Sequence, residues 1–168
     1  MLNNNSNFIK ESTDGIKNGV PIFLGYFTTS VAFGLLAVSS GLTPFEAVFF
    51  SMSNLTGAAQ FMAINLISTG AAAGEIIISV ALLNLRYFIM SASLARKLGF
   101  KKAYRKLLTA FGVTDEVFSV ASLKQGRVSG SFMLGLQGIS WIGWATGTLA
   151  GVTAGSFLPA ALQDAMSV

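Results

Sequence analysis

A long stretch without cations constrains this chain most: no Lys or Arg occurs between Lys17 and Arg86. Over the whole chain 52% of the residues are hydrophobic and only 11% are charged. An ordinary soluble domain has about 25% charged residues. The 168 residues provide room for four or five helical spans of roughly 20 residues each. The sequence therefore predicts an all-α, polytopic integral membrane protein in a lipid bilayer.

The composition also excludes several classes of function. The chain has no Cys and no His, which removes disulfides, thiolate metal sites, Cys nucleophiles and the commonest general base. No nucleophile–base pair, metal-ligand cluster or phosphate-binding loop is visible. Six of the eleven cations lie in the segment Arg96–Lys106, which is typical of a topology signal and not of a nucleic-acid surface. We therefore expect no enzyme activity, no catalytic residue, no metal, no cofactor and no nucleic-acid partner.

The hydrophobic segments divide the chain into a polar N-terminal tail, residues 1–18, and a single transmembrane helical domain, residues 19–168. The tail is expected to form either a surface-lying amphipathic turn or a disordered segment. Thr43 and Pro44 have the residue types of an N-cap and a first helical position. The expected hydrophobic helical segments are Val20–Val38, Phe45–Ser68, Glu75–Leu98, Leu107–Leu123 and Gly130–Ala150.

The basic segment 96–106 sets the expected orientation, because cations in short loops mark the cytoplasmic side. The polar centre Asn54–Gln60 of the second hydrophobic segment leaves two topologies open. If that segment crosses the membrane once, the N-terminus is outside. If it re-enters at 54–60 and returns, the N-terminus is inside, and we favour this second topology. Leu107–Leu123 is short, has cations on both sides and is also expected to be re-entrant or interfacial.

Polar residues in the apolar segments are the candidate functional residues, because polar groups at membrane depth are costly and usually face a protein interior or an aqueous path. Arg86 lies about 15 Å of helix away from Arg96, too far to reach the same headgroups easily. We therefore expect an internal partner for Arg86, either a substrate carboxylate or one of the two consecutive acids Asp115 and Glu116. These two acids are expected either to lie in a solvated cytoplasmic turn or to provide a protonatable group in the pathway. The candidate pathway residues are Asn54, Gly57, Gln60, Asn84, Arg86, Asp115 and Glu116.

A small-residue stripe in the last hydrophobic segment predicts helix packing and no chemistry. Gly147, Gly151 and Gly155 recur at every fourth position. Such spacing lets two helix backbones approach closely in lipid.

Five motifs follow one another along the chain: Gly25–Ala37, Gly41–Ala47, Gly57–Phe61, Asn84–Arg86 and Thr114–Phe118. Together they resemble the AzlC family, the larger subunits of bacterial branched-chain amino acid exporters. The resemblance extends from about Gly19 to Pro159 and implies a protein of the bacterial cytoplasmic (inner) membrane. It also implies a small AzlD-type membrane subunit as partner, and export of leucine, isoleucine, valine and sometimes methionine, coupled to an ion gradient.

This resemblance assigns provisional roles to the polar residues. An amino acid zwitterion needs a cation or a helix N-terminus for its carboxylate, and we expect Arg86 or the break at 54–60 to supply one. It needs an acceptor for its ammonium, for which Gln60, Asn84 and Asp115 qualify. It also needs an apolar pocket, and the expected lining residues are Phe61, Phe88 and Trp141.

Two departures from the family pattern are visible. Tyr87 follows the Asn-Leu-Arg motif, where the family usually has another residue, and the chain ends at Val168, where the family continues through further hydrophobic segments. We therefore expect a shortened chain: a fragment, a truncated form or a short member. An uncoupled pore and a non-transporting assembly subunit remain the alternative functions.

Overall fold

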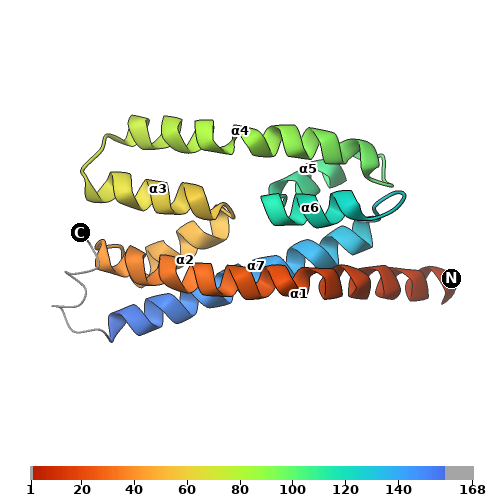
Figure 1. Ribbon diagram of the computed structural model, residues 1–168, viewed down its shortest axis with the longest axis horizontal. Coiled ribbons are helices and arrows are strands. Elements are labelled where there is room, and N and C mark those ends of the chain that lie inside the picture. Colours follow the sequence, from red (N-terminus) through yellow and green to blue (C-terminus); the bar gives the residue numbers. More distant parts are fainter. Residues whose placement is uncertain (1, 158–168) are drawn as a thin grey trace. The chain divides into compact units, whose positions relative to one another are not determined.

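The computed structural model describes residues 2–157, and within that range the chain is helical without any strand (Figure 1). The only extended pairing in this range is a single parallel bridge between Leu98 and Val128. The helices are α1 (Leu2–Ser39), α2 (Pro44–Ser53), α3 (Gly57–Ser68), α4 (Ala73–Lys97), α5 (Ala103–Phe111), α6 (Asp115–Leu123) and α7 (Gly130–Ser156).

Helices α1 and α4 are long and apolar enough to cross a membrane, over Ser6–Ser39 and Ala73–Lys97. The expectation of an all-α membrane fold is confirmed. The expected tail, residues 1–18, differs from what the structure shows, because α1 begins at Leu2 and continues without a break past Pro21. The polar residues at the start of α1 continue the same backbone hydrogen-bond ladder as the apolar ones.

The second hydrophobic segment is interrupted, as its polar centre predicts. The structure divides Phe45–Ser68 into α2 and α3, separated by residues 54–56. Helix α2 begins with a reciprocal cap. The Thr43 hydroxyl accepts a hydrogen bond from the Glu46 backbone N–H, and the Glu46 carboxylate accepts one from the Thr43 backbone N–H at 2.8 Å. The Thr43 hydroxyl also donates to the Glu46 carboxylate at 2.7 Å, and this bond together with that from the Thr43 backbone N–H lowers the pKa of Glu46 below its ordinary value.

Contacts divide the chain into two units that share the three long helices. One comprises Met1–Leu24 and Leu85–Ile142 and is called here the α5–α6 unit. The other comprises Gly25–Asn84 and Gly143–Val168 and is called the α2–α3 unit. Each unit thus contains parts of α1, α4 and α7 together with one pair of short helices.

In the α2–α3 unit the two short helices form a hairpin. Ala47, near the start of α2, and Ile64, near the end of α3, belong to the same buried cluster as Phe33 and Ala37 of α1. The outer ends of both short helices are therefore near the same stretch of α1, and Figure 1 shows α3 running back from the turn that ends α2. Inside the cluster the rings of Phe33 and Phe61 meet edge to face, with centroids 5.9 Å apart. This geometry agrees with the re-entrant form of the segment.

Close backbone contact holds α7 against α1 in the same unit. A Cβ atom built on Gly147 would lie 2.1 Å from the Ser30 hydroxyl oxygen, and one on Gly151 would lie 2.2 Å from the Val31 carbonyl oxygen. Only glycine permits this approach, as the four-residue spacing predicts. A Cβ on Gly155 would meet Val38 at an ordinary 3.5 Å.

In the α5–α6 unit the two short helices form a second hairpin, with its break at residues 112–114. The Lys106 ammonium, in the first half of α5, donates to the Ala95 carbonyl at 3.1 Å. The Lys97 ammonium, at the end of α4, donates to the Ser122 carbonyl at the end of α6. Both outer ends of the hairpin therefore contact the last turn of α4. The segment expected at Leu107–Leu123 is thus divided into α5 and α6, and α5 begins earlier than expected, at Ala103.

Candidate functional site

The tip of the α2–α3 hairpin leaves a helix N-terminus without a side-chain cap. Thr56 precedes α3 in the N-cap position, yet its side chain makes no capping bond. Its hydroxyl instead donates to the Asn54 side-chain oxygen at 2.7 Å, and its backbone N–H points to the same oxygen at 3.3 Å. The first N–H groups of a helix have no intrahelical acceptor, and they carry partial positive charge. The start of α3 at Gly57 is therefore suited to an anion.

Gln60 closes this tip from inside. Its side chain is completely buried, and its amide nitrogen donates to the backbone carbonyls of Asn54 and Ser51. These bonds tie α3 back onto the end of α2. The Gln60 amide oxygen, Oε1, has no hydrogen-bond partner among the described residues. A buried acceptor without a partner is costly, so this atom offers a place to a donor from outside the chain.

Trp144 of α7 covers the same helix start. Its indole is 3% exposed, and its Cη2 atom would lie 2.7 Å from a Cβ built on Gly57. The Tyr26 ring meets the indole edge to face at 5.1 Å. The indole nitrogen Nε1, which can only donate, has no partner in the described part of the chain. The tip therefore combines an unpaired buried donor, an unpaired buried acceptor and an uncapped helix N-terminus.

A buried hydroxyl pair fixes the base of this arrangement. The Ser51 and Thr148 hydroxyls lie 2.6 Å apart and are both fully buried, which joins the last turn of α2 to α7. The Thr148 hydroxyl also contacts the Trp144 carbonyl at 3.0 Å. Because Ser51 also receives the Gln60 amide at its carbonyl, the hairpin tip and the Trp144 turn of α7 are connected by polar contacts.

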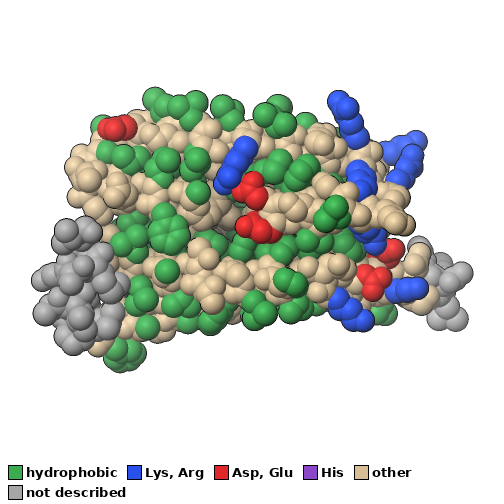
Figure 2. Space-filling view, in the orientation of Figure 1, with side chains coloured by type: hydrophobic (Ala, Val, Ile, Leu, Met, Phe, Trp, Pro, Cys, Tyr) green, Lys and Arg blue, Asp and Glu red, His purple; other side chains and the backbone are tan. Residues whose placement is uncertain are grey.

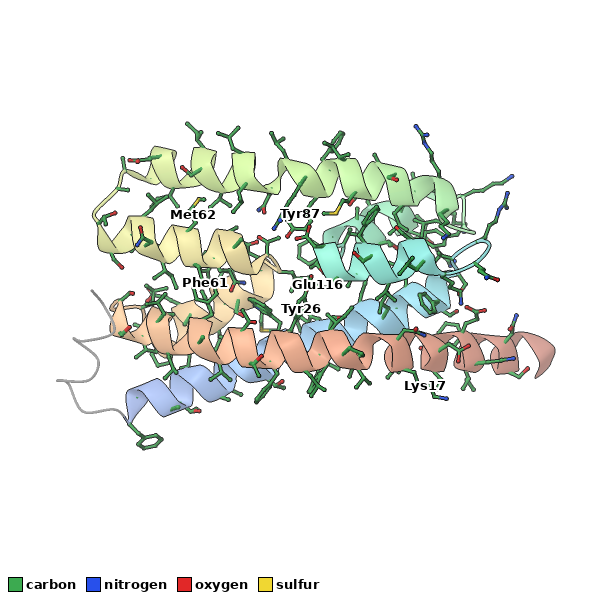
Figure 3. The ribbon with its side chains drawn as sticks, viewed as in Figure 1. Lys17, Tyr26, Phe61, Met62, Tyr87 and Glu116 are labelled. Atoms are coloured by element: carbon green, nitrogen blue, oxygen red, sulfur yellow. The ribbon has the colours of Figure 1, made fainter. Side chains whose placement is uncertain are left out.

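A charged cluster occupies the start of α6 in the α5–α6 unit. Arg86 and Asp115 form an ion pair at 3.1 Å, with 43% and 45% of their side chains exposed. The Tyr87 hydroxyl accepts a hydrogen bond from Arg86 at 2.8 Å and donates one to Asp115 at 3.1 Å. Figure 3 shows Tyr87 extending from α4 toward the start of α6, where Glu116 lies. Asp115 is thus the internal partner that the structure provides for Arg86.

The start of α6 differs electrostatically from that of α3. The Thr114 hydroxyl accepts from the Val117 backbone N–H at 3.4 Å, so this helix has a side-chain cap. Asp115 and Glu116 then occupy its first turn, where carboxylates compensate the helix dipole. The two hairpins therefore offer different chemistry: an uncompensated helix N-terminus at α3 and an acid-rich one at α6.

The structure does not group all the predicted residues. Asn84 has a buried side-chain oxygen without a hydrogen-bond partner in the described range. The Phe88 ring is 77% exposed, so its expected pocket-lining role has no support in the structure. Trp141 is only half-buried. The buried tryptophan is Trp144, three residues further along α7, while Phe61 packs against the buried cluster of the α2–α3 unit.

Sequence reasoning chose Trp141 and not Trp144 as a pocket-lining residue, noted Tyr87 only as a departure from the family pattern, and missed the Ser51–Thr148 pair. Trp144 and Trp141 are alike as letters in an apolar helix, and only the packing of α7 distinguishes them. The polarity of Tyr87 beside Arg86 was a signal that could have placed it in the charged cluster.

Comparison with known proteins places these motifs in a family. A family model described as AzlC protein matches residues 21–158. The chain is 34% identical over 150 residues to the inner membrane protein YgaZ of Escherichia coli, an alignment that covers 86% of this chain and 61% of that protein. It is 37% identical over 146 residues to an uncharacterized membrane protein of Archaeoglobus fulgidus, with 86% and 63% covered.

A more distant relative has a name that states a function. The chain is 25% identical over 143 residues to the branched-chain amino acid transport protein AzlC of Bacillus subtilis, with 83% of this chain and 56% of that protein covered. The chain thus spans about three fifths of the length of the curated relatives it matches. No solved structure matches it.

Proposed function

Because the chain belongs to the AzlC family of membrane proteins, we propose that it is a transporter subunit that exports branched-chain amino acids. A transport-related membrane role follows from the family, and the substrate class and the outward direction are the proposal. We further propose that it works with a small AzlD-type membrane subunit in the bacterial inner membrane, with the basic segment 96–106 in the cytoplasm.

The observation that carries the proposal is the set of unpaired polar atoms at the tip of the α2–α3 hairpin. A zwitterionic amino acid brings a carboxylate and an ammonium to one place. The start of α3 and the Trp144 indole N–H supply donors for the carboxylate. The Gln60 side-chain oxygen supplies an acceptor for the ammonium. Broken helices at membrane depth use their free ends in this way.

We assign the preference for substrates with apolar side chains to the residues that surround the tip of the α2–α3 hairpin. Phe61 and Tyr26 are aromatic neighbours of the buried cluster and of Trp144, respectively. A branched aliphatic side chain gains free energy by leaving water for such surroundings, about 25 cal/mol per Å² buried. Neither aromatic ring carries a positive charge that could pair with an acidic side chain of a substrate, so acidic amino acids are disfavoured.

Coupling to an ion gradient is assigned to the charged cluster of Arg86, Tyr87 and Asp115. Acids are the proton-carrying candidates in a chain that has no His. Asp115 forms an ion pair with Arg86 and accepts a hydrogen bond from the Tyr87 hydroxyl, and both partners lie on α4. A change in the charge of Asp115 would therefore change the contact between α4 and the start of α6. Protonation of Asp115 is the proposed event that links transport to the gradient.

The first test measures intracellular valine, leucine and methionine in cells fed dipeptides, with this chain expressed alone or with a small AzlD-type subunit. Pools that fall in the expressing cells relative to cells without the chain support export, and a fall that requires the small subunit supports the heteromer. Unchanged pools in both cases, with membrane insertion confirmed, contradict the proposal.

The second test replaces the residues that carry the argument. Gln60→Ala and Arg86→Ala should each return the pools to the level of non-expressing cells, at equal abundance in the membrane. The matched control is Asn65→Ala, which removes an exposed amide from the same helix as Gln60 and should leave export unchanged. If both Gln60→Ala and Arg86→Ala export normally, the site assignment is wrong.

A further inference from the structure

A cavity in the α5–α6 unit has a lining that shares no residue with either polar cluster. Its volume is about 830 Å³, within the range of sites that hold small molecules. It is bounded by α5, the first turns of α7, the connections that follow α4 and precede α7, and one residue of α1. The residues that line it are Phe8, Gly99, Phe100, Tyr104, Arg105, Leu108, Thr109, Arg127, Ser129, Gly130, Ser131, Leu134 and Gln137.

The described lining of the cavity is cationic. Arg105 and Arg127 both belong to it, and none of the described lining residues is an Asp or a Glu. The ion pairs of the described residues join Arg86 to Asp115 and Lys124 to Glu11, and neither cavity arginine takes part in one. The Arg105 guanidinium contacts the Tyr104 hydroxyl at 3.3 Å. Within the described part of the chain, two guanidinium groups beside the cavity therefore have no anionic partner.

Helix α5, which lines part of the cavity, also presents an apolar face outward. Helix α5 exposes Tyr104, Leu107, Leu108 and Phe111, a stripe with the spacing of one helix face. Thr109 of the same helix is buried, and its carbonyl accepts the Gln137 amide at 2.7 Å, which holds α5 against α7. A helix with such an exposed apolar face is suited to contact with lipid.

Lys124, in contrast to Arg105 and Arg127, already has an anionic partner in the chain. Its ammonium is held by the Glu11 carboxylate at 2.9 Å and lies 4.0 Å from the centre of the Phe132 ring. Glu11 also accepts a hydrogen bond from the Ser129 hydroxyl. This pairing removes Lys124 and Ser129 from the anion-binding set and leaves the two arginines as its charged members.

We propose that this cavity binds an anionic phospholipid. The phosphodiester headgroup contacts Arg105 and Arg127, and an acyl chain lies along Leu108 and Leu134 toward the exposed face of α5. Guanidinium groups match phosphate oxygens in geometry and charge. Figure 2 shows further Lys and Arg side chains gathered around the end of α4, and these raise the local concentration of anionic lipid. Charge complementarity selects this occupant over a zwitterionic lipid.

The test is native mass spectrometry of the detergent-solubilised protein titrated with phosphatidylglycerol and, separately, with phosphatidylcholine. The wild-type chain should retain one phosphatidylglycerol at concentrations where phosphatidylcholine is lost. Arg105→Gln with Arg127→Gln should weaken phosphatidylglycerol retention roughly thirtyfold, as two cations at a lipid surface imply. Both arginines are exposed, so their replacement should not disturb folding.

A matched control separates this site from general attraction by the basic segment. Arg96→Gln with Lys101→Gln removes the same charge from exposed positions that do not line the cavity, and it should retain the lipid. Equal loss in the control pair overturns the proposal, as does equal retention of the two lipids. Inorganic phosphate should not displace the lipid at equal concentration, and Leu108→Ser should weaken the lipid alone. If phosphate displaces the lipid and Leu108→Ser has no effect, the site binds free phosphate instead.

Discussion

The Gln60 side-chain amide donates a hydrogen bond to the Asn54 backbone carbonyl across the turn that joins α2 to α3. One buried side chain thereby holds the two halves of a broken helix together, while its own oxygen stays without a partner in the described chain. The residue that stabilises the break is thus also the one that offers an acceptor at it. Stability and binding at this tip should therefore respond together to changes of Gln60.

Gln60→Met should destabilise the protein by roughly 1–3 kcal/mol, because it leaves the Asn54 and Ser51 carbonyls without their donor in a buried place. The free energy of unfolding is measured by thermal or denaturant unfolding in detergent. Asn65→Met is the control, because that amide is exposed on the same helix, and its change should stay within about 0.5 kcal/mol. Equal losses in the two variants would show that the Gln60 contacts contribute nothing specific.

Gly57→Ala should reduce stability and transport together, because the new methyl group would lie 2.7 Å from the Trp144 ring. Overpacking of this kind costs typically about 1–3 kcal/mol. Trp144→Phe removes the ring atoms that the methyl group would meet. In a double-mutant cycle the pair should show a coupling energy of about 0.5–3 kcal/mol that favours the double variant. A coupling energy near zero would argue against direct contact between these two positions.

Arg86→Gln should separate stability from function. The ion pair with Asp115 is nearly half exposed, so it contributes only about 0–1 kcal/mol to folding. Export should nevertheless fall strongly, because the charge that holds Asp115 is removed from the proposed coupling cluster. Arg96→Gln, an exposed cation further along the same helix, is the control for charge alone. Normal export by Arg86→Gln at equal abundance would exclude the cluster from the transport cycle.

Glycine positions along α7 should differ in tolerance according to their distance from α1. Gly151→Ala should destabilise by roughly 1–3 kcal/mol or more, because its Cβ would lie 2.2 Å from the Val31 carbonyl oxygen. Gly155→Ala meets its nearest atom at 3.5 Å and should be neutral, or stabilising by up to about 1 kcal/mol through helix propensity. The comparison is made by thermal unfolding of both variants in one detergent. A larger loss for Gly155→Ala would contradict the packing of these helices.

Local sequence signals predicted the broken segments well and their partners poorly. The Ser, Asn, Thr and Gly residues around position 54 compete with helical hydrogen bonds, so the interruption of the segment is visible without a structure. Thr43 and Pro44 form the expected start of α2, and Glu46 completes the cap, since capping involves residues three positions apart. The structure continues α1 back to Leu2 through a run of Asn and Ser residues, which have low helix propensity, so local signals did not indicate this extension.

The sequence by itself determined that this is an all-α membrane protein with polar breaks in apolar helices, because hydrophobicity, charge spacing and capping are properties of neighbouring residues. Only the tertiary structure decided that Trp144 rather than Trp141 covers the start of α3, and that Tyr87 connects Arg86 to Asp115. These contacts join residues far apart in the chain, and their formation depends on how α4, α6 and α7 pack. The packing also decides which polar atoms stay buried without a partner, and the proposed site lies at two of these atoms, in Gln60 and Trp144.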